Sequence, residues 1–153
     1  NLNNMKKTTL IVLVIITFFT LGCNRENNYL CCSPPPDFHL FVNKSSSLYQ
    51  DFLDDKGEFD KQNVYFYQLL NNNEERKYDT FSVIHTPKKE GYAVVYINSA
   101  PFLYTGKTET LYLKNKAKTY KIEFLGTIGE CCSAHFQEMY IDGIKNNNFI
   151  LVK

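Results

Sequence analysis

The chain lacks an excess of either charge, and it is poor in the residues that mark fibrous or low-complexity proteins. Its 153 residues include 17 lysines and arginines against 16 aspartates and glutamates, so there is no basic surplus to neutralise a phosphate backbone. This balance disfavours nucleic acid as a partner, and the lack of an acidic surplus disfavours a disordered chain. Only seven glycines and five prolines are present, whereas 44% of the residues are hydrophobic. The composition predicts one ordinary packed domain with a short appendage.

Tryptophan is absent, whereas 11 tyrosines and 12 phenylalanines supply bulk for an aromatic-rich core. True immunoglobulin domains carry a buried tryptophan, so any likeness to them is architectural only. After the first 22 residues no long window has a helical period, and short apolar or alternating stretches between turn residues prevail. The expected strands cover residues 38–42, 64–70, 78–85, 92–98, 111–114, 120–124, 136–141 and 149–152. They predict an all-β fold, an antiparallel β-sandwich of immunoglobulin-like or transthyretin-like topology with about seven to eight strands.

Three stretches carry more specific local predictions. The nearly continuous apolar run at 64–70 is typical of a strand that is buried on both faces, and 71–76 is expected to be a loop. Residues 48–53 are expected to form a helical turn or an edge piece. The dipeptide Asp142-Gly143 predicts a type I′ hairpin, because both of its residues tolerate a positive φ.

A continuous apolar run long enough to cross a membrane is also missing. The longest run begins at Leu10 and ends at Leu21, which is short of the ~20 residues that a spanning helix needs. Two lysines that follow Met5 precede this run, and together they form the basic and apolar regions of a secretory signal. We therefore expect residues 1–22 to be a signal peptide, with residues 1–4 lying upstream of the true start.

The leader ends in Thr20-Leu21-Gly22-Cys23, which resembles the lipobox of bacterial lipoproteins. The family pattern prefers leucine where Thr20 stands. The resemblance implies that Cys23 is the lipidation site and that its acyl chains bind the membrane, at about 0.8 kcal/mol per buried CH₂. The alternative is an ordinary secretory signal without acylation of Cys23.

The resemblance also implies a place for the protein and a division of the chain. Residues 23–36 would be the lipidated cysteine and a short tether, and 37–153 the β-sandwich domain. Asn24 follows the lipid cysteine, which by the enterobacterial sorting rule indicates the outer membrane of the cell envelope. The strand order and the paired cysteines are similar to those of small Bacteroidetes lipoproteins of unassigned activity, and this likeness brings no functional residues with it.

Besides Cys23, the cysteines form two vicinal pairs, Cys31-Cys32 and Cys131-Cys132. An even number in an exported chain predicts disulfides. Bridges between the two pairs are expected to be less strained than a bridge within one pair. A bond between the pairs would remove ~4–5 kcal/mol of unfolded-state entropy in the chain-entropy model, and would join the start of the domain to its end.

The alternative role for these cysteines is a zinc or copper(I) site. Cys131, Cys132 and His135 lie close in sequence, and His39 follows the first pair, so thiolates and imidazoles could meet. Neither pair has the C-x-x-C spacing, and an oxidising compartment favours bridges. The leading interpretation therefore includes no metal and no cofactor.

Catalytic motifs are absent from the sequence, including the G-x-S-x-G elbow and H-E-x-x-H. The histidines are expected to be partly exposed strand residues, and most tyrosines to be buried, with Tyr104 in an exposed loop. The acidic segment 51–60 is expected to be a solvated loop rather than a calcium site, because its carboxylates do not follow the alternate spacing of an EF-hand. An exposed row of tyrosines would instead provide a binding face for sugar or protein.

These observations predict a lipid-anchored cell-envelope protein that is not an enzyme. Its domain is expected to act as a binding or structural module, with the membrane as one partner through Cys23 and an envelope protein or glycan as another. A periplasmic metal handler is the alternative from a different functional class.

Overall fold

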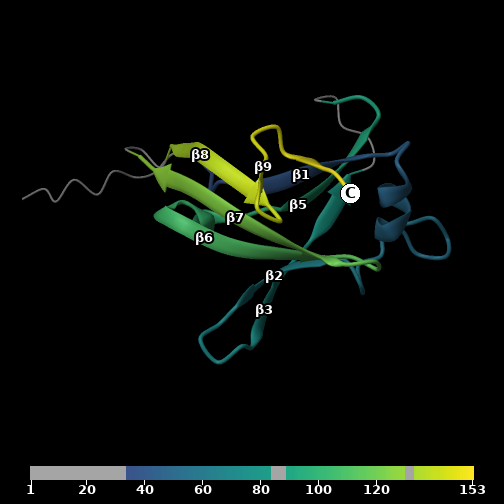
Figure 1. Cartoon of the computed structure of the whole chain (residues 1–153), viewed down its shortest axis with the longest axis horizontal. Helices are drawn as coiled ribbons and strands as arrows, with labels where there is room; N and C mark the ends of the chain where they lie inside the picture. Colours follow the sequence, from purple (N-terminus) through teal and green to yellow (C-terminus); the bar gives the residue numbers. More distant parts are fainter. Residues whose placement is uncertain (1–33, 84–88, 130–132) are drawn as a thin grey trace, which may run out of the picture. The chain divides into compact units, whose positions relative to one another are not determined.

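Two β-sheets make up the fold of the described residues, which are 34–83, 89–129 and 133–153 of the computed structural model and lie within one unit, Cys31–Lys153. The four-stranded sheet has the order β10 (Ile150–Leu151), β1 (Phe38–Asn43), β5 (Tyr92–Ile97) and β4 (Phe81–Val83). The six-stranded sheet has the order β3 (Glu75–Tyr78), β2 (Tyr65–Leu69), β6 (Thr105–Lys114), β7 (Thr119–Ile128), β8 (Ala134–Ile141) and β9 (Ile144–Lys145). The predicted all-β sandwich is confirmed (Figure 1).

Neighbouring strands are antiparallel, except that β10 runs parallel to β1. Two short 3₁₀ helices, η1 (Ser47–Phe52) and η2 (Pro101–Leu103), complete the described elements. η1 confirms the helical turn that was one of the two expectations for residues 48–53. Among the described residues, no helix has both the length and the apolar character to cross a membrane.

The core lies between the inner faces of the two sheets, because strand residues alternate between buried and partly exposed positions. Phe38 of β1 is 1% exposed and packs edge to face on Phe66 of β2 and on Phe124 of β7, with each pair of ring centroids 5.6 Å apart. These contacts join the two sheets through aromatic rings, a geometry that adds about 0.5–1.5 kcal/mol per pair beyond simple burial.

The ten strands of the described residues exceed the predicted number because several are only two to four residues long. The expected loop 71–76 includes the start of β3, and the expected strand 78–85 is divided between β3 and β4. Between β3 and β4 a side chain takes the place of a backbone carbonyl as the hydrogen-bond acceptor. The Thr80 hydroxyl accepts a 2.9 Å hydrogen bond from the Phe66 amide of β2.

The prediction that 64–70 is buried on both faces is wrong. Phe66 is 0% exposed and lies in the core, whereas Tyr65 points outward and is half-buried. The run is continuous because tyrosines occupy the outward positions, and a tyrosine keeps its hydroxyl in water while its ring is covered by neighbours. The unbroken apolar run therefore combines core residues on one side of the strand with partly covered tyrosines on the other side.

The hairpin between β8 and β9 has the predicted turn. Asp142 and Gly143 have φ values of 52° and 79°, as a type I′ turn requires. The Asp142 carboxylate accepts hydrogen bonds from the Lys121 amide at 2.8 Å and from the Lys118 ammonium at 2.9 Å. This turn is therefore tied to the neighbouring strand β7 and to the loop before it.

Candidate functional site

Most of the predicted site residues lie outside the described residues. These are Cys23, Cys31, Cys32, Cys131, Cys132 and, among the histidines, His85. The lipidation site, the disulfides and the thiolate ligands therefore stay predictions. His39 and His135 are the two imidazoles of the described residues.

His39 lies on the outward side of β1. Its Nδ1 is 3.3 Å from a carboxylate oxygen of Asp37, and its ring stacks on Phe149 with a centroid distance of 5.5 Å and an interplanar angle of 28°. The ring is thus held between an acidic group and an aromatic one at the start of the strand. This is the partly exposed strand position that the sequence predicts.

His135 lies near the start of β8 and is exposed. Its Nε2 is 3.0 Å from the hydroxyl oxygen of Ser133, a contact between a hydroxyl and a base that a nucleophilic pair would need. Within the described residues no further polar side chain orients the ring. The two residues lie at an exposed strand end, and the described residues add no third member to the pair.

The described residues add no metal ligands to the two histidines that the metal-site alternative names. Among residues 34–83, 89–129 and 133–153, no three His, Cys, Asp or Glu side chains are grouped as a metal ion would require. His39 and His135 come from strands of different sheets. Any site would depend on the cysteines that lie outside the described ranges.

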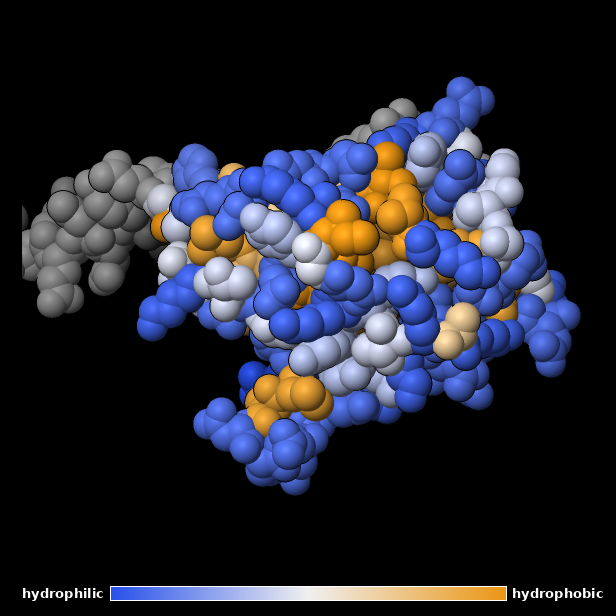
Figure 2. Space-filling model, in the orientation of Figure 1, coloured by the Kyte–Doolittle hydropathy of each residue, from blue (hydrophilic) through white to orange (hydrophobic). Residues whose placement is uncertain are grey.

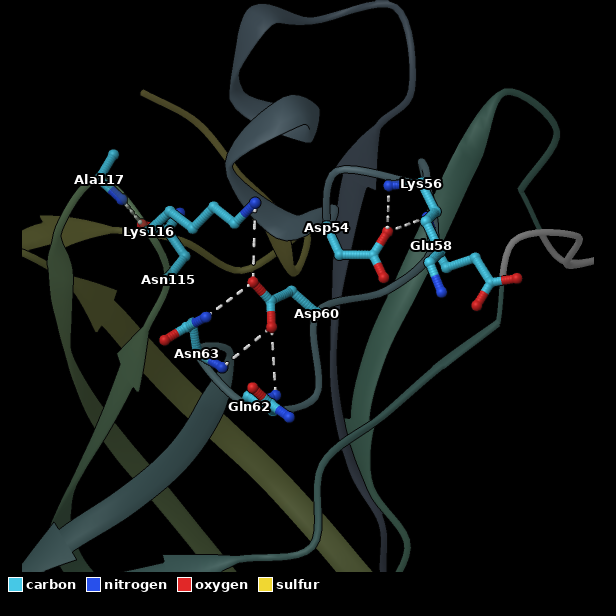
Figure 3. A network of polar contacts seen from close by, with 9 residues as sticks. All are labelled: Asp54, Lys56, Glu58, Asp60, Gln62, Asn63, Asn115, Lys116 and Ala117. Atoms are coloured by element: carbon cyan, nitrogen blue, oxygen red, sulfur yellow. Dashed lines mark hydrogen bonds and ion pairs between the residues drawn. The ribbon is translucent and has the colours of Figure 1, made fainter.

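In the acidic segment after η1, Asp54 and Asp60 form an ordered network, whereas Asp55 and Glu58 are exposed as a solvated loop predicts (Figure 3). Asp60 is 7% exposed, and its carboxylate accepts hydrogen bonds from the amides of Gln62 and Asn63, each at 3.2 Å, and from the Asn63 side chain at 2.9 Å. The Lys116 ammonium lies 3.6 Å away. For Asp60 the expectation of a solvated side chain is wrong, because the carboxylate organises the turn that precedes β2.

These contacts change the acidity of Asp60. The hydrogen bond from the Asn63 side chain, aided by two backbone amides and the charge of Lys116, holds the pKa of the Asp60 carboxyl below its ordinary value despite partial desolvation. Asp54 has a related role, since one of its oxygens accepts 2.9 Å bonds from the amides of Lys56 and Glu58. Both carboxylates are occupied in shaping loops, which is a structural rather than a cation-binding use.

The outer face of the six-stranded sheet combines tyrosines with charged pairs, and we call it the tyrosine–lysine face. Its members are Tyr65, Tyr67, Glu75, Lys77, Tyr112, Lys114, Lys121, Glu123, Glu138, Tyr140 and Lys145. The rings of Tyr67 and Tyr112 stack 5.1 Å apart at 18°, and the Lys77 ammonium lies 4.1 Å above the ring of Tyr65.

Most of the charges on this face are paired within the face. Lys121 lies 2.8 Å from Glu123, Lys145 lies 3.4 Å from Glu138, and Lys77 lies 4.0 Å from Glu75. The rings are likewise covered by one another or by ammonium groups. The predicted row of tyrosines exists, but its rings stack on one another or lie beneath ammonium groups, which leaves less free ring surface for a sugar.

The outer face of the four-stranded sheet is different, and we call it the aromatic face. It consists of His39, Phe41, Phe81, Tyr92, Val94 and Tyr96. Phe81 is 40% exposed and packs on Tyr96, with ring centroids 5.6 Å apart. The Lys89 ammonium lies 5.1 Å and 4.9 Å from the ring centres of Phe41 and Tyr92. None of these six residues carries a carboxylate.

A third exposed feature is the tip of the β2–β3 hairpin. Leu69 and Leu70 are 45% and 40% exposed, and Figure 2 shows an apolar patch on this hairpin surrounded by hydrophilic residues. Contiguous apolar patches rimmed by polar residues mark contacts with other proteins, whereas apolar side chains exposed singly are ordinary. We call these two residues the hairpin tip.

Tyr104 is half-buried rather than on an exposed loop. Its ring packs edge to face on Phe124, with centroids 5.0 Å apart, and burial raises the pKa of its hydroxyl. Gly126 makes room for this packing, because a Cβ there would lie 2.7 Å from the Tyr104 ring. Tyrosine 104 thus belongs to the margin of the core.

Two features of the site were not anticipated from the sequence. The turn-forming role of Asp60 had a local signal, since an aspartate side chain often accepts a hydrogen bond from the backbone amide two residues on, here that of Gln62. The aromatic face had no such signal, because which outward residues share a surface depends on strand pairing.

Comparisons with protein-family models, with curated proteins and with solved structures find no match to this chain. Its function is therefore inferred from its residues and their geometry.

Proposed function

We propose that the protein is a lipid-anchored component of the bacterial outer membrane, and that its β-sandwich is a binding module without catalytic activity. One observation carries the proposal: Cys23 follows a leader with a basic start and an apolar run too short to span a membrane. Acyl chains on Cys23 would supply the membrane affinity. The domain is then free to use its surface for a partner.

The partner that the domain best suits is an envelope protein that contacts the hairpin tip. Leu69 and Leu70 expose more of their side chains than most apolar residues of the domain. A glycan is less well supported, because the tyrosines of the tyrosine–lysine face already stack on each other or on ammonium groups. An apolar pocket in a protein partner would cover the two leucines at little entropic cost, since the hairpin is already ordered.

Replacing Cys23 tests the anchor directly. The full chain expressed with its leader should fractionate with membranes and carry a mass that matches cleavage before Cys23 with acyl chains added. Cys23→Ser should move the protein to the soluble fraction. Cys31→Ser is the matched control and should leave both lipid and fractionation unchanged. An unacylated Cys23, or a leader that is still attached, contradicts the proposal.

Replacing the leucines tests the partner surface. The intact lipoprotein is captured from solubilised envelopes and compared with a variant that combines Leu69→Ser and Leu70→Ser. An abundant companion should be recovered with the parent protein and lost from the variant. Ile144→Ser, at a position that is 69% exposed on β9, is the control and should retain the companion. Equal recovery with both variants would exclude the hairpin tip as the contact.

Elemental analysis separates this proposal from the metal-handling alternative. Protein purified without chelator should contain no stoichiometric zinc or copper, and its four cysteines beyond Cys23 should resist thiol titration until a reductant is added. Stoichiometric metal with free thiols would instead favour a site built from Cys131, Cys132, His135 and His39.

A further inference from the structure

We propose that the aromatic face lies against the bilayer that holds the anchor, and that it orients the domain on the membrane. This inference rests on the proposed lipid anchor, which supplies the affinity. The aromatic face would add a weak contact that selects one orientation of the domain among those that the tether permits.

The composition of the aromatic face suits the region of lipid headgroups. Tyrosine, histidine and phenylalanine side chains combine an apolar body with, in the first two, a polar end, and such residues concentrate at membrane interfaces. The six outward positions of the face include no carboxylate. The tyrosine–lysine face, with Glu75, Glu123 and Glu138, would have to place three acidic groups near anionic lipids.

The charges at the margin of the aromatic face agree with this orientation. Lys89 is held above Phe41 and Tyr92, where its ammonium can reach a lipid phosphate while its stem covers the rings. Asp37, at the opposite end of the face, is engaged with His39 at 3.3 Å. Glu90, next to Lys89, is exposed and free to remain in water.

The tether brings the aromatic face within reach of the membrane. From Cys23 to the start of β1 at Phe38 the chain can extend to at most about 50 Å. A domain of this size has a radius of gyration of about 14 Å, so every face of it can touch the bilayer. The tether raises the effective concentration of the surface to the millimolar range, at which a weak contact is populated.

The small exposed area of the aromatic face favours a tethered contact over a second copy of the chain. Phe81, at 40%, is the most exposed of the six residues, so six side chains of about 150–250 Å² each offer at most on the order of 600 Å². A stable dimer needs about 800 Å² from each partner. The area therefore falls short of what a dimer requires, whereas a tethered face needs no independent affinity.

The absence of tryptophan gives a clean test, because a single introduced indole reports on its own surroundings. Phe81→Trp places the probe on the aromatic face, and Tyr112→Trp places it on the tyrosine–lysine face as a matched control. Each full-length lipoprotein is reconstituted in vesicles of phosphatidylethanolamine and phosphatidylglycerol with brominated acyl chains. We expect the indole at position 81 to be quenched and blue-shifted, and the indole at position 112 to be unaffected.

The other outcomes overturn the proposal in distinguishable ways. Equal quenching, or no quenching, at the two positions excludes a preferred orientation. A blue shift at position 81 that needs no lipid and grows with protein concentration shows that a second copy covers the face. Flotation and intact mass report on the anchor separately, and loss of the anchor removes the basis of this inference together with the proposed function. Tyr96→Trp replaces Phe81→Trp if that variant fails to fold by circular dichroism.

Discussion

The two outer faces of the sandwich carry different chemistry although the same strand alternation produces both. The tyrosine–lysine face holds three ion pairs and stacked rings, so its charges and its π-surfaces are largely satisfied within the face. The aromatic face holds six residues without a carboxylate, and Phe81 at its edge is 40% exposed. One face thus presents paired charges among its rings, and the other presents rings without a carboxylate.

This difference shows which part of the sequence specifies the fold and which part is free for function. The inner residues of both sheets are apolar because they must fill one core, and they differ little in kind. Outward residues carry no such constraint, so a departure from ordinary surface composition there calls for a reason outside the fold. The aromatic face is such a departure, and the tyrosine–lysine face is not.

The largest effect should come from exchanging an inner phenylalanine of β1, with an outer one as the control. Phe38→Ala removes the ring that contacts both sheets, and we expect it to lower the free energy of unfolding by about 3–5 kcal/mol. Phe41→Ala, on the same strand but on the aromatic face, should cost about 1 kcal/mol. Urea denaturation followed by circular dichroism measures both. Similar losses would mean that the aromatic face is part of the core.

A smaller effect is expected for Asp60, a buried charge that belongs to neither face. Asp60→Asn points its amide hydrogens either at the Asn63 side chain and Lys116 or at the backbone amides of Gln62 and Asn63, all of which are donors. It should lower the free energy of unfolding by about 1–3 kcal/mol at neutral pH. Because the pKa of Asp60 is lowered in the folded protein, its contribution is present above the unfolded pKa near 4 and is lost as the pH falls through the folded pKa.

The matched control for this prediction is Asp55→Asn, which alters an exposed carboxylate in the same loop. Asp55→Asn should keep the neutral-pH stability and the acid slope of the parent, whereas Asp60→Asn should be less stable at pH 7 and should lose less on acidification. Thermal melts between pH 7 and pH 2 measure the difference. An identical acid slope in the two variants would show that Asp60 gains nothing from its partners.

The fold could be predicted in large part because hydrophobic alternation acts locally. The strand at 38–42 and the alternating stretch at 120–124 appear as β1 and β7, and the Asp142-Gly143 turn has the predicted type. The first half of β6 was missed, since Thr105 to Thr110 is polar and is held by its ladder with β7 rather than by burial. Long-range pairing of this kind leaves no local signal.

The candidate surfaces could be predicted less well for the same physical reason. Tyr65 and Tyr67 could be recognised as strand residues, but their stacking on Lys77 and Tyr112 depends on which strands lie beside β2. The aromatic face likewise forms only when β1, β5 and β4 become neighbours. Periodicity assigns a residue to a face, and pairing decides which other residues share that face.

The smallest effect would come from the ammonium–ring contacts, which occur on both faces. Lys77 is 4.1 Å from the ring centre of Tyr65, and Lys89 is 5.1 Å from that of Phe41. A double-mutant cycle with Lys77→Gln and Tyr65→Leu should give a coupling of about 0.5–1 kcal/mol, and the cycle with Lys89→Gln and Phe41→Leu should give less, because the attraction weakens with distance.

The salt dependence of these couplings sharpens the comparison between the faces. Glu75 lies 4.0 Å from Lys77 and also accepts a 3.3 Å hydrogen bond from the Tyr65 hydroxyl, so part of the Lys77–Tyr65 coupling is transmitted through this carboxylate. That part should fall in 1 M salt, where the screening length is about 3 Å. The coupling of Lys89 to Phe41 involves no carboxylate and should change less. If both couplings fall equally, Lys89 is held by charge and not by the rings beneath it. The aromatic face would then lack the ring-bound cation that its proposed contact with lipid phosphate requires.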